Sequence, residues 1–532
     1  MKNKKILLAL FAITFMMLLV ACGGSDDEGA SGETDTEKTE DTNTETEEGN
    51  EEESSGEQVL KIANDQEPAG LDPHITPAHS SVRVYSKIYS TLVRFDENME
   101  ITSDLAKEWD WKDDTTLVFQ LREGVTFHNG DEVTAEDVIY SFERILDEET
   151  GSHIASYLGS IDSMEATDTY EVTFHLASPD ATLLTNLTNS SAAIVNQAVV
   201  EENGDLQQVA VGTGPFKLEE WVPDNRVTLS KNEDYYVEGQ PAVDKLEYYT
   251  MVEEASRLSA VRTGEVDMTT VTAQSAELLE NEENVNVMDF QTLEYSYVGF
   301  DMNHEILSNQ KVRQALSLAT NREAIADIVW NGQATVSGPI APSMGNWSID
   351  VKEHDLYSND LDQARQLLEE AGYGNGFEIE ITAASTYADM IDTAQILQQQ
   401  WAEIGVDASI KQVEWGEYID IWSNTSADVL VGRNGSGSDP DRAMNYFFNS
   451  EGSANVWGYA DEEYDEIVTN GKTTIDDEKR QEIYVEAQNH LLEQSPNLFL
   501  VSPKNYVAVR DSVENYQPYP HNAEYIVETT KK

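Results

Sequence analysis

The spacing of apolar residues between Phe377 and Ile410 places the strongest constraint on how this chain can fold. Apolar and other side chains alternate from Phe377 to Ala383, as they do in a half-buried strand. A helical stretch follows from about Ala388 to Ile404, Gly405 ends it, and the alternation resumes from Val406 to Ile410. A strand, a helix and a strand in so short a segment are typical of a right-handed crossover, which requires two parallel strands in one sheet. The sequence therefore predicts an α/β fold.

Helix and strand signals also alternate along the rest of the chain. A hydroxyl cap and acids at 134–137 precede a helix whose apolar face includes Val138 and Phe142. Residues 117–121 alternate as a strand does, and no tandem repeat with the spacing of a solenoid or propeller is present. A chain of 532 residues is too long for one typical core. We expect two or three domains of mixed α and β structure.

The N-terminal segment has the pattern of an export signal. Lysines precede an apolar run from Ile6 to Ala21, which is shorter than the roughly 20 apolar residues of a membrane span. The only cysteine, Cys22, follows within Leu19-Val20-Ala21-Cys22-Gly23, which resembles the lipobox of bacterial lipoproteins. The resemblance implies a signal peptide over residues 1–22 that ends at a lipidated Cys22, which would hold the protein to the outer face of the cell membrane. The alternative is an ordinary signal with a chance cysteine. With a single cysteine no intramolecular disulfide is possible, so the core must stabilise the fold.

Residues 23–57 contain almost no apolar side chains and many acids, so we predict a disordered acidic linker with a mean reach of about 30 to 35 Å. The whole chain carries 100 acidic and 33 basic residues, a formal net charge of −67. This balance argues against a nucleic-acid partner, because phosphate binding relies on clustered lysines and arginines.

Six short motifs follow the linker in a fixed order. They are Leu105 to Val138, Gly212 to Phe216, Val312 to Leu316, Leu368 to Tyr373, Glu414 to Tyr418, and Asp439 to Asp441. Each string is short, but together and in this order they resemble the solute-binding proteins of peptide and nickel ABC importers.

The resemblance implies a two-lobed, periplasmic-binding-protein-like α/β fold of type II, of the large peptide-binder class. Lobe one would comprise residues 58–298 plus 490–532, with an extra subdomain at about 90–209, and lobe two residues 299–489. Two chain crossings between the lobes would form a hinge, and a ligand that touches both lobes would favour a closed form. The expected partners are a peptide ligand and the permease and ATPase subunits of a membrane ABC importer. We expect a monomer with no cofactor.

The resemblance also bears on the ligand. In the dipeptide-binding branch of the family, an aspartate holds the ligand ammonium and an arginine holds its carboxylate. Ser436 and Ser385 stand at the matching positions of this chain. A strict dipeptide specificity is therefore not expected, and an oligopeptide or a modified peptide such as glutathione is the predicted ligand.

Several residues near these positions are candidates for ligand binding. Arg433 follows an apolar run and would offer a cation at a strand end, and the glycine-rich segment 432–437 would let backbone amides approach an anion. Aromatic side chains would form walls against a ligand. The alternatives are an ion pair for Arg433, an ordinary loop, and aromatic packing within lobe two. The candidates are Arg433, Asn434, Ser436, Asp439, Trp415, Tyr418 and Tyr387.

Other classes of function have weaker support. The sequence has no Gly-x-Ser-x-Gly elbow, no His-Glu-x-x-His helix and no nucleotide-phosphate loop, so we do not expect an enzyme, and a secreted hydrolase is the least favoured alternative. A nickel or other metal-chelate binding protein of the same importer family is another alternative, since His74 and His79 lie near the expected cleft. Two loop histidines are weak ligands on spacing alone, and no metal residues are assigned.

Overall fold

The computed structural model describes residues 57–96, 99–520 and 525–532. The predicted signal peptide, its lipidated Cys22 and nearly all of the predicted 23–57 linker lie outside these ranges. Within the described residues, no helix combines the length and the apolar character that crossing a membrane requires.

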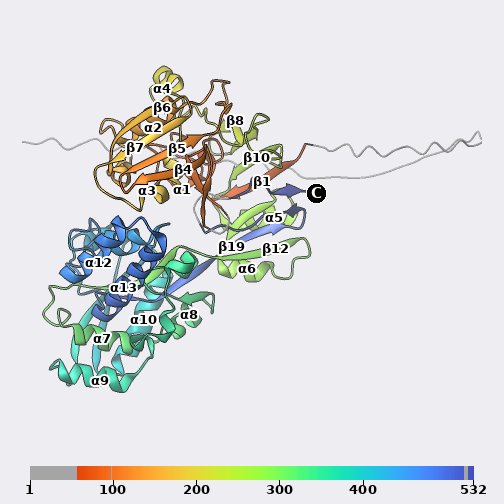
Figure 1. Cartoon of the computed structure of the whole chain (residues 1–532). Coiled ribbons are helices and arrows are strands. Elements are labelled where there is room, and N and C mark those ends of the chain that lie inside the picture. The colour runs from red at the N-terminus through yellow and green to blue at the C-terminus, as the bar shows by residue number, and fades with distance from the viewer. Residues whose placement is uncertain (1–56, 97–98, 521–524) are drawn as a thin grey trace, which may run out of the picture. The chain divides into compact units, whose positions relative to one another are not determined.

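The largest sheet has eight strands in the order β12-β19-β11-β1-β10-β9-β8, with β14 paired to β19 (Figure 1). They are β1 (Val59–Asn64), β8 (Phe216–Val222), β9 (Arg226–Lys231), β10 (Lys245–Thr250), β11 (Met268–Val271), β12 (Val285–Gln291), β14 (Ala334–Val336) and β19 (Val501–Arg510). Strand β1 runs parallel to β10 and β11, whereas β19 runs antiparallel to β11 and β12. Both ends of the described chain thus contribute to one sheet. The helices of this region are α1 (His79–Tyr85), α5 (Glu254–Thr263) and α6 (Ala273–Leu279).

A four-stranded antiparallel sheet, β4-β5-β7-β6, forms a separate layer. It comprises β4 (Ala106–Asp113), β5 (Thr116–Leu121), β6 (Ile161–Asp168) and β7 (Glu171–Leu176), with β2 (Val93–Phe95), β3 (Ile101–Ser103), α2 (Ala135–Leu146), α3 (Leu183–Leu187) and α4 (Gln197–Asn203) nearby. The predicted helix after Thr134 is confirmed: Thr134 and Asp137 form a capping box, and Val138 and Phe142 are buried. The ring of Phe174 on β7 makes an edge contact with Phe142, with 5.2 Å between centroids.

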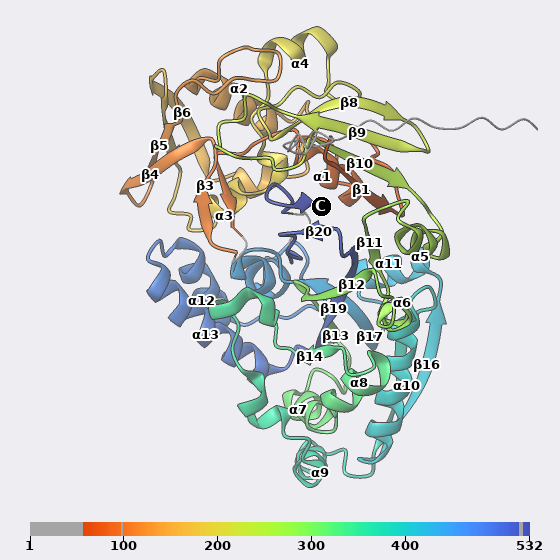
Figure 2. The same ribbon diagram turned by 90° about the vertical axis from the view of Figure 1, so that its right-hand side faces the viewer.

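The third sheet has the order β16-β15-β17-β13-β18, and this sheet with the helices around it is called the second lobe below. Its strands are β13 (Glu294–Phe300), β15 (Phe377–Ala384), β16 (Val406–Val413), β17 (Val429–Gly435) and β18 (Asn497–Phe499). Its helices are α7 (Gln310–Leu318), α8 (Arg322–Val329), α9 (Leu361–Glu370), α10 (Ala388–Ala402), α11 (Trp415–Ser423), α12 (Glu462–Thr473) and α13 (Asp477–Gln494). Strands β15 and β16 are parallel over their whole length, and α10 lies along β16 (Figure 2), so the predicted crossover is confirmed.

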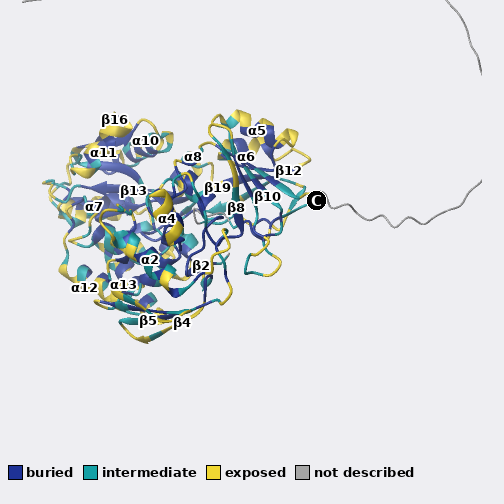
Figure 3. Cartoon of the chain, turned by 90° about the horizontal axis from the view of Figure 1, so that it is seen from above, coloured by how far each residue is buried: buried dark blue, intermediate teal, exposed yellow. Residues whose placement is uncertain are grey.

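Separate apolar cores lie against the three sheets. The core of the second lobe includes the fully buried Trp401 of α10, whereas the core of the four-stranded sheet centres on Phe119 and Phe174. Figure 3 shows buried residues along the strands and exposed residues on outer helices such as α4 and α5. The sheets therefore provide the rigid parts on which the loops between them are held.

The glycines of the Gly212–Phe216 motif permit a close backbone approach. The amide of Gly214 donates to the carbonyl of Ile88 at 2.8 Å. A Cβ atom at Gly212 would lie 2.1 Å from the Ile88 oxygen, and one at Gly214 would lie 2.6 Å from the Lys87 oxygen. Only glycine fits at these two positions, so the close backbone packing explains why the motif contains both glycines.

Candidate ligand-binding cleft

A cavity of about 1310 Å³ is lined by residues from segments next to each of the three sheets. One wall comes from 156–189 beside the four-stranded sheet, another from 435–453 after β17, and a third from residues near β12 and β19. This volume exceeds the roughly 300 to 1,000 Å³ of common small-molecule pockets. Most of the lining side chains are hydroxyls and amides, such as Ser160, Asn186 and Asn445. The cavity suits a hydrophilic ligand larger than a single metabolite.

The last residue of β17, Gly435, lines this cavity. The amide of Ser436 donates to the carbonyl of Leu293 at 2.7 Å, in line with the antiparallel pairing of β13 and β17. Backbone groups along such a strand point alternately to its two edges, so those of Arg433 and Gly435 point away from β13. On that side β15 pairs only with the first two residues of β17. The end of β17 therefore offers backbone donors and acceptors to an added extended chain.

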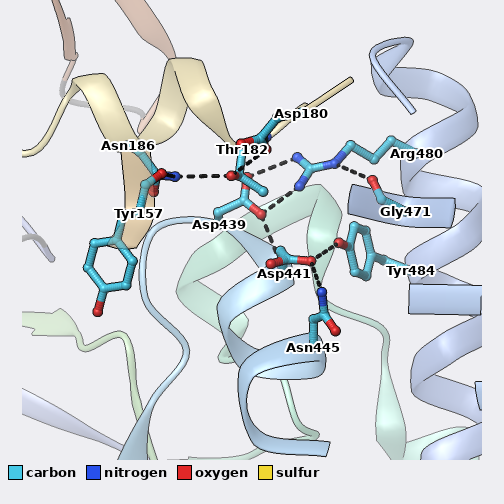
Figure 4. A network of polar contacts seen from close by, with 10 residues as sticks. All are labelled: Tyr157, Asp180, Thr182, Asn186, Asp439, Asp441, Asn445, Gly471, Arg480 and Tyr484. Atoms are coloured by element: carbon cyan, nitrogen blue, oxygen red, sulfur yellow. Dashed lines mark hydrogen bonds and ion pairs between the residues drawn. The ribbon is translucent and has the colours of Figure 1, made fainter. Parts of the chain in front are cut away.

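Asp439 lines the cavity but is held in a buried ion pair (Figure 4). Its carboxylate accepts two hydrogen bonds from Arg480, at 2.6 and 2.9 Å, and Arg480 also donates to the carbonyl of Gly471. The two charged side chains are only 7% and 3% exposed. The carboxylate beside it, Asp441, accepts from the Tyr484 hydroxyl at 3.0 Å. Burial, reinforced by the charge of Asp439, raises the pKa of Asp441 to about 6.

Two hydrogen bonds join the 156–189 wall to the second lobe. The amide of Ala181 donates to the carbonyl of Lys472 at 2.8 Å, and the Arg442 guanidinium donates to the Tyr157 hydroxyl at 3.1 Å. The loop that carries Ala181 is ordered by Asp180, whose carboxylate accepts from the amide and the hydroxyl of Thr182. These contacts place both walls of the cavity against each other at its rim.

The candidate Arg433 has a carboxylate partner. Its Nε donates to Asp389 at 2.8 Å, and its Nη2 makes a second contact with the same carboxylate. The guanidinium also lies over the ring of Tyr387, 5.0 Å from the centroid. Trp415 stacks on Tyr418, with 5.2 Å between centroids, and meets Tyr387 edge-on. The structure thus brings these four candidates together, in a cluster whose members are not among the residues lining the cavity.

The remaining candidates lie on or just after β17. Asn434 pairs across the ladder with Tyr295. Ser436 is fully buried, and its hydroxyl accepts from the amide of Ala341 at 2.8 Å. Among the seven candidates, therefore, only Asp439 lines the cavity. A role of any of the seven in ligand binding stays a prediction.

The cavity is also lined by charged residues that the sequence did not single out. They include Glu294 at the start of β13, Arg442, Glu451 and Lys472. Arg442 directly follows the Asp439-Pro440-Asp441 motif, so its position next to a family motif was an available signal. No local pattern marks Glu294, since it only begins a strand.

His74 is engaged at both ring nitrogens. Arg144 donates to its Nδ1 at 2.7 Å, and its Nε2 donates to the carbonyl of Ala193 at 2.9 Å. Arg144 is itself paired with Asp72. Burial lowers the pKa of His74 to about 4. The ring is therefore occupied, and no group of three metal-ligating side chains is found in the part of the chain that the structure describes.

The two lobes and their sheets define a solute-binding protein of the type II fold, and comparison with known proteins agrees. Residues 100–455 match the bacterial extracellular solute-binding proteins, family 5 (middle region). The di/tripeptide-binding protein 3 of Pseudomonas aeruginosa (strain UCBPP-PA14) is 30% identical over 505 residues, which cover 88% of this chain and 94% of the relative. The chain therefore belongs to family 5 of the bacterial extracellular solute-binding proteins.

Solved structures show the same fold. The periplasmic binding protein DppA of Helicobacter pylori, in complex with the peptide STSA, is 27% identical with a TM-score of 0.71, and the match covers 89% of this chain and 98% of that one. The oligopeptide-binding protein AppA of Bacillus subtilis, in complex with a nonapeptide, is 25% identical with a TM-score of 0.71, covering 90% of this chain and 99% of that one.

Proposed function

We propose that this protein captures peptides between its two lobes and delivers them to the permease and ATPase subunits of a membrane ABC importer. The observation that carries the proposal is the open edge of β17, whose last residue, Gly435, lines a polar cavity large enough for several residues. An extended peptide that adds to such an edge gains main-chain hydrogen bonds whatever its side chains are. Relatives named as di/tripeptide-binding, oligopeptide-binding and glutathione-binding proteins support the ligand class. They also fit a protein that is not an enzyme.

The lobe division predicted from the sequence, 58–298 plus 490–532 and 299–489, is part of this proposal, with the boundaries moved to the ends of β12 and β18 because β13 and β18 pair in the third sheet. Its support comes from the two neighbouring segments that join β12 to β13 and β18 to β19. There Thr292 donates through its hydroxyl to the carbonyl of Pro503 at 3.0 Å, and Gln291 donates to the carbonyl of Ser502 at 2.7 Å. Two crossings tied to each other form a hinge about which a monomer closes on its ligand.

The test is native mass spectrometry after incubation with an equimolar library of peptides of two to nine residues. We expect the protein to retain intact peptides of varied sequence, because the backbone provides most of the contacts. Retention of no member of the library would contradict peptide capture. The appearance of cleaved peptides would favour a hydrolase, and a metal-chelate complex retained in preference to every peptide would favour the nickel-type alternative.

The lipid anchor at Cys22 is proposed on the lipobox resemblance, and its residues lie outside those that the structure describes. We expect Cys22→Ala to release the protein into the medium while ligand affinity stays unchanged, and peptide uptake by the cells to fall. The reason is that a tether keeps the binder at a high effective concentration near its importer. Fractionation and uptake of a labelled peptide measure both effects, with Ser25→Ala as the matched control. Uptake that survives full release would show that the anchor is incidental.

A further inference from the structure

Arg442 has no carboxylate partner among the residues that the structure describes, although the chain is rich in carboxylates. Acids outnumber bases by 100 to 33. Other arginines near the cavity are paired, Arg433 with Asp389 and Arg480 with Asp439. No ion pair joins Arg442 to any of the described residues 57–96, 99–520 and 525–532. Its positive charge therefore remains available to a ligand in the cavity that it lines.

The side chain of Arg442 is held in position by its surroundings. Its guanidinium carbon lies 4.9 Å from the ring centroid of Tyr446 and 5.8 Å from that of Phe447. Its stem packs against the backbone at Gly437, where an added Cβ atom would lie only 2.3 Å from the Arg442 Cδ. A hydrogen bond to Tyr157 fixes one end of the guanidinium. A pre-positioned guanidinium of this kind is suited to bind a carboxylate.

Glu294 is the matching anion on the neighbouring strand. It is the exposed first residue of β13, and its register partner on β17 is Gly435, which has no side chain to cover it. Its amide is bonded to the Thr292 hydroxyl, but its carboxylate makes no hydrogen bond or ion pair with the described part of the chain. It also lines the cavity, as does its register partner Gly435.

The other carboxylates of the cavity differ from Glu294. Asp439 is neutralised by Arg480, Asp180 caps Thr182, and the half-buried Asp441 accepts from Tyr484. Glu451 is the other lining glutamate whose carboxylate has no partner among the residues described, but it lies on the turn after Asn449 and belongs to no strand. Among these five carboxylates, only that of Glu294 is both without a partner among the described residues and carried by a strand that pairs with β17.

Glu294 and Arg442 flank the same turn after β17. Glu294 is opposite Gly435, and Arg442 packs on Gly437, two residues further along. Both residues line the same cavity, and two or three extended residues span roughly 7 to 11 Å between their charged ends. We propose that Glu294 binds the ammonium and Arg442 the carboxylate of a di- or tripeptide with two free ends. This inference rests on the proposed peptide-binding function and names its substrate class.

Calorimetry with trialanine, N-acetyl-trialanine and trialanine amide tests the proposal. The wild-type protein should bind trialanine at least about tenfold more tightly than either blocked peptide, since each block removes one charge-assisted contact. Glu294→Gln should abolish the preference against the acetylated peptide only. Arg442→Gln should abolish the preference against the amide only.

Matched variants separate these effects from general damage to the cleft. Glu451→Gln removes the other unengaged glutamate and should keep both preferences, and Tyr157→Phe removes the hydrogen bond to Arg442 but leaves its charge. The proposal is overturned if the wild-type protein binds the three peptides equally or does not bind trialanine, or if Glu294→Gln and Arg442→Gln keep both preferences. Failure of the proposed function itself would appear differently, as a lack of binding to every member of the peptide library.

Discussion

Replacing Asp439 with alanine is expected to lower the free energy of unfolding by about 3 to 5 kcal/mol. The substitution leaves the guanidinium of Arg480, which is 2% exposed as a residue, buried without its counter-ion. A guanidinium keeps its proton in proteins, so the side chain cannot escape the cost by becoming neutral. Urea unfolding at pH 7 measures the loss.

Two further variants test whether the loss of stability comes from leaving a buried charge unpaired. Asp362→Ala removes the partner of Arg365 in a pair whose side chains are 97% and 49% exposed, and should cost less than about 1 kcal/mol. The double variant Asp439→Ala with Arg480→Met removes both buried charges and should recover part of the loss. A single variant as stable as the wild type, or a double variant less stable than Asp439→Ala, would contradict a structural role for this pair. Asp439 also lines the cavity, so its substitution could change ligand binding. Comparing binding with stability in the same variants shows whether such a change follows only from the loss of folding.

The parts of the fold that the sequence predicted are those in which neighbours in the chain are neighbours in space. The crossover from Phe377 to Ile410 could be predicted because β15, α10 and β16 follow one another in the chain. Each element buries one face, so its apolar residues recur with the spacing typical of a strand or a helix. The large sheet is different. Strand β1 pairs with β10 and β11, and β11 with the C-terminal β19, across separations of about two hundred residues or more. No local period encodes such pairings, and only the family resemblance anticipated a lobe made from both chain ends.

The site was predicted less well, for an electrostatic reason. The sequence showed that Arg433 follows a buried strand, but with 100 acids in the chain it could not show that Asp389 of α10 neutralises it. Equally, an arginine without a partner cannot be recognised before the fold is known. Arg442 and Glu294 became candidates only when the structure showed which charges remain unpaired in the cavity. The type of residue is a sequence property, whereas the availability of its charge is a tertiary one.

Acidification from pH 7 to pH 4 is expected to destabilise the protein, and three groups, His74, His128 and Asp441, together contribute a loss of about 3 kcal/mol. Burial lowers the pKa of His74 and of His128 to about 4, from 6.5 in the unfolded chain. The folded protein then binds fewer protons than the unfolded chain between pH 6.5 and 4, so the contribution of both histidines is complete above pH 6.5 and is lost as the pH falls. Asp441 acts in the opposite sense, because its pKa is raised to about 6 from 3.8, and the folded state gains protons there on acidification.

Because the histidines and Asp441 act in opposite senses, single variants can separate their contributions to the pH dependence of stability. His128→Gln removes one of the histidines that resist protonation, so it should reduce the loss of stability between pH 6.5 and 4. Asp441→Asn removes the group that offsets them, so it should enlarge the loss by about the 3 kcal/mol that a shift of two pKa units represents. Urea unfolding at pH 7, 6, 5 and 4 measures the three slopes. If Asp441→Asn flattened the pH dependence, the half-buried carboxylate beside the cavity would have to be ionised throughout this range, and the histidines could no longer account for the acid sensitivity.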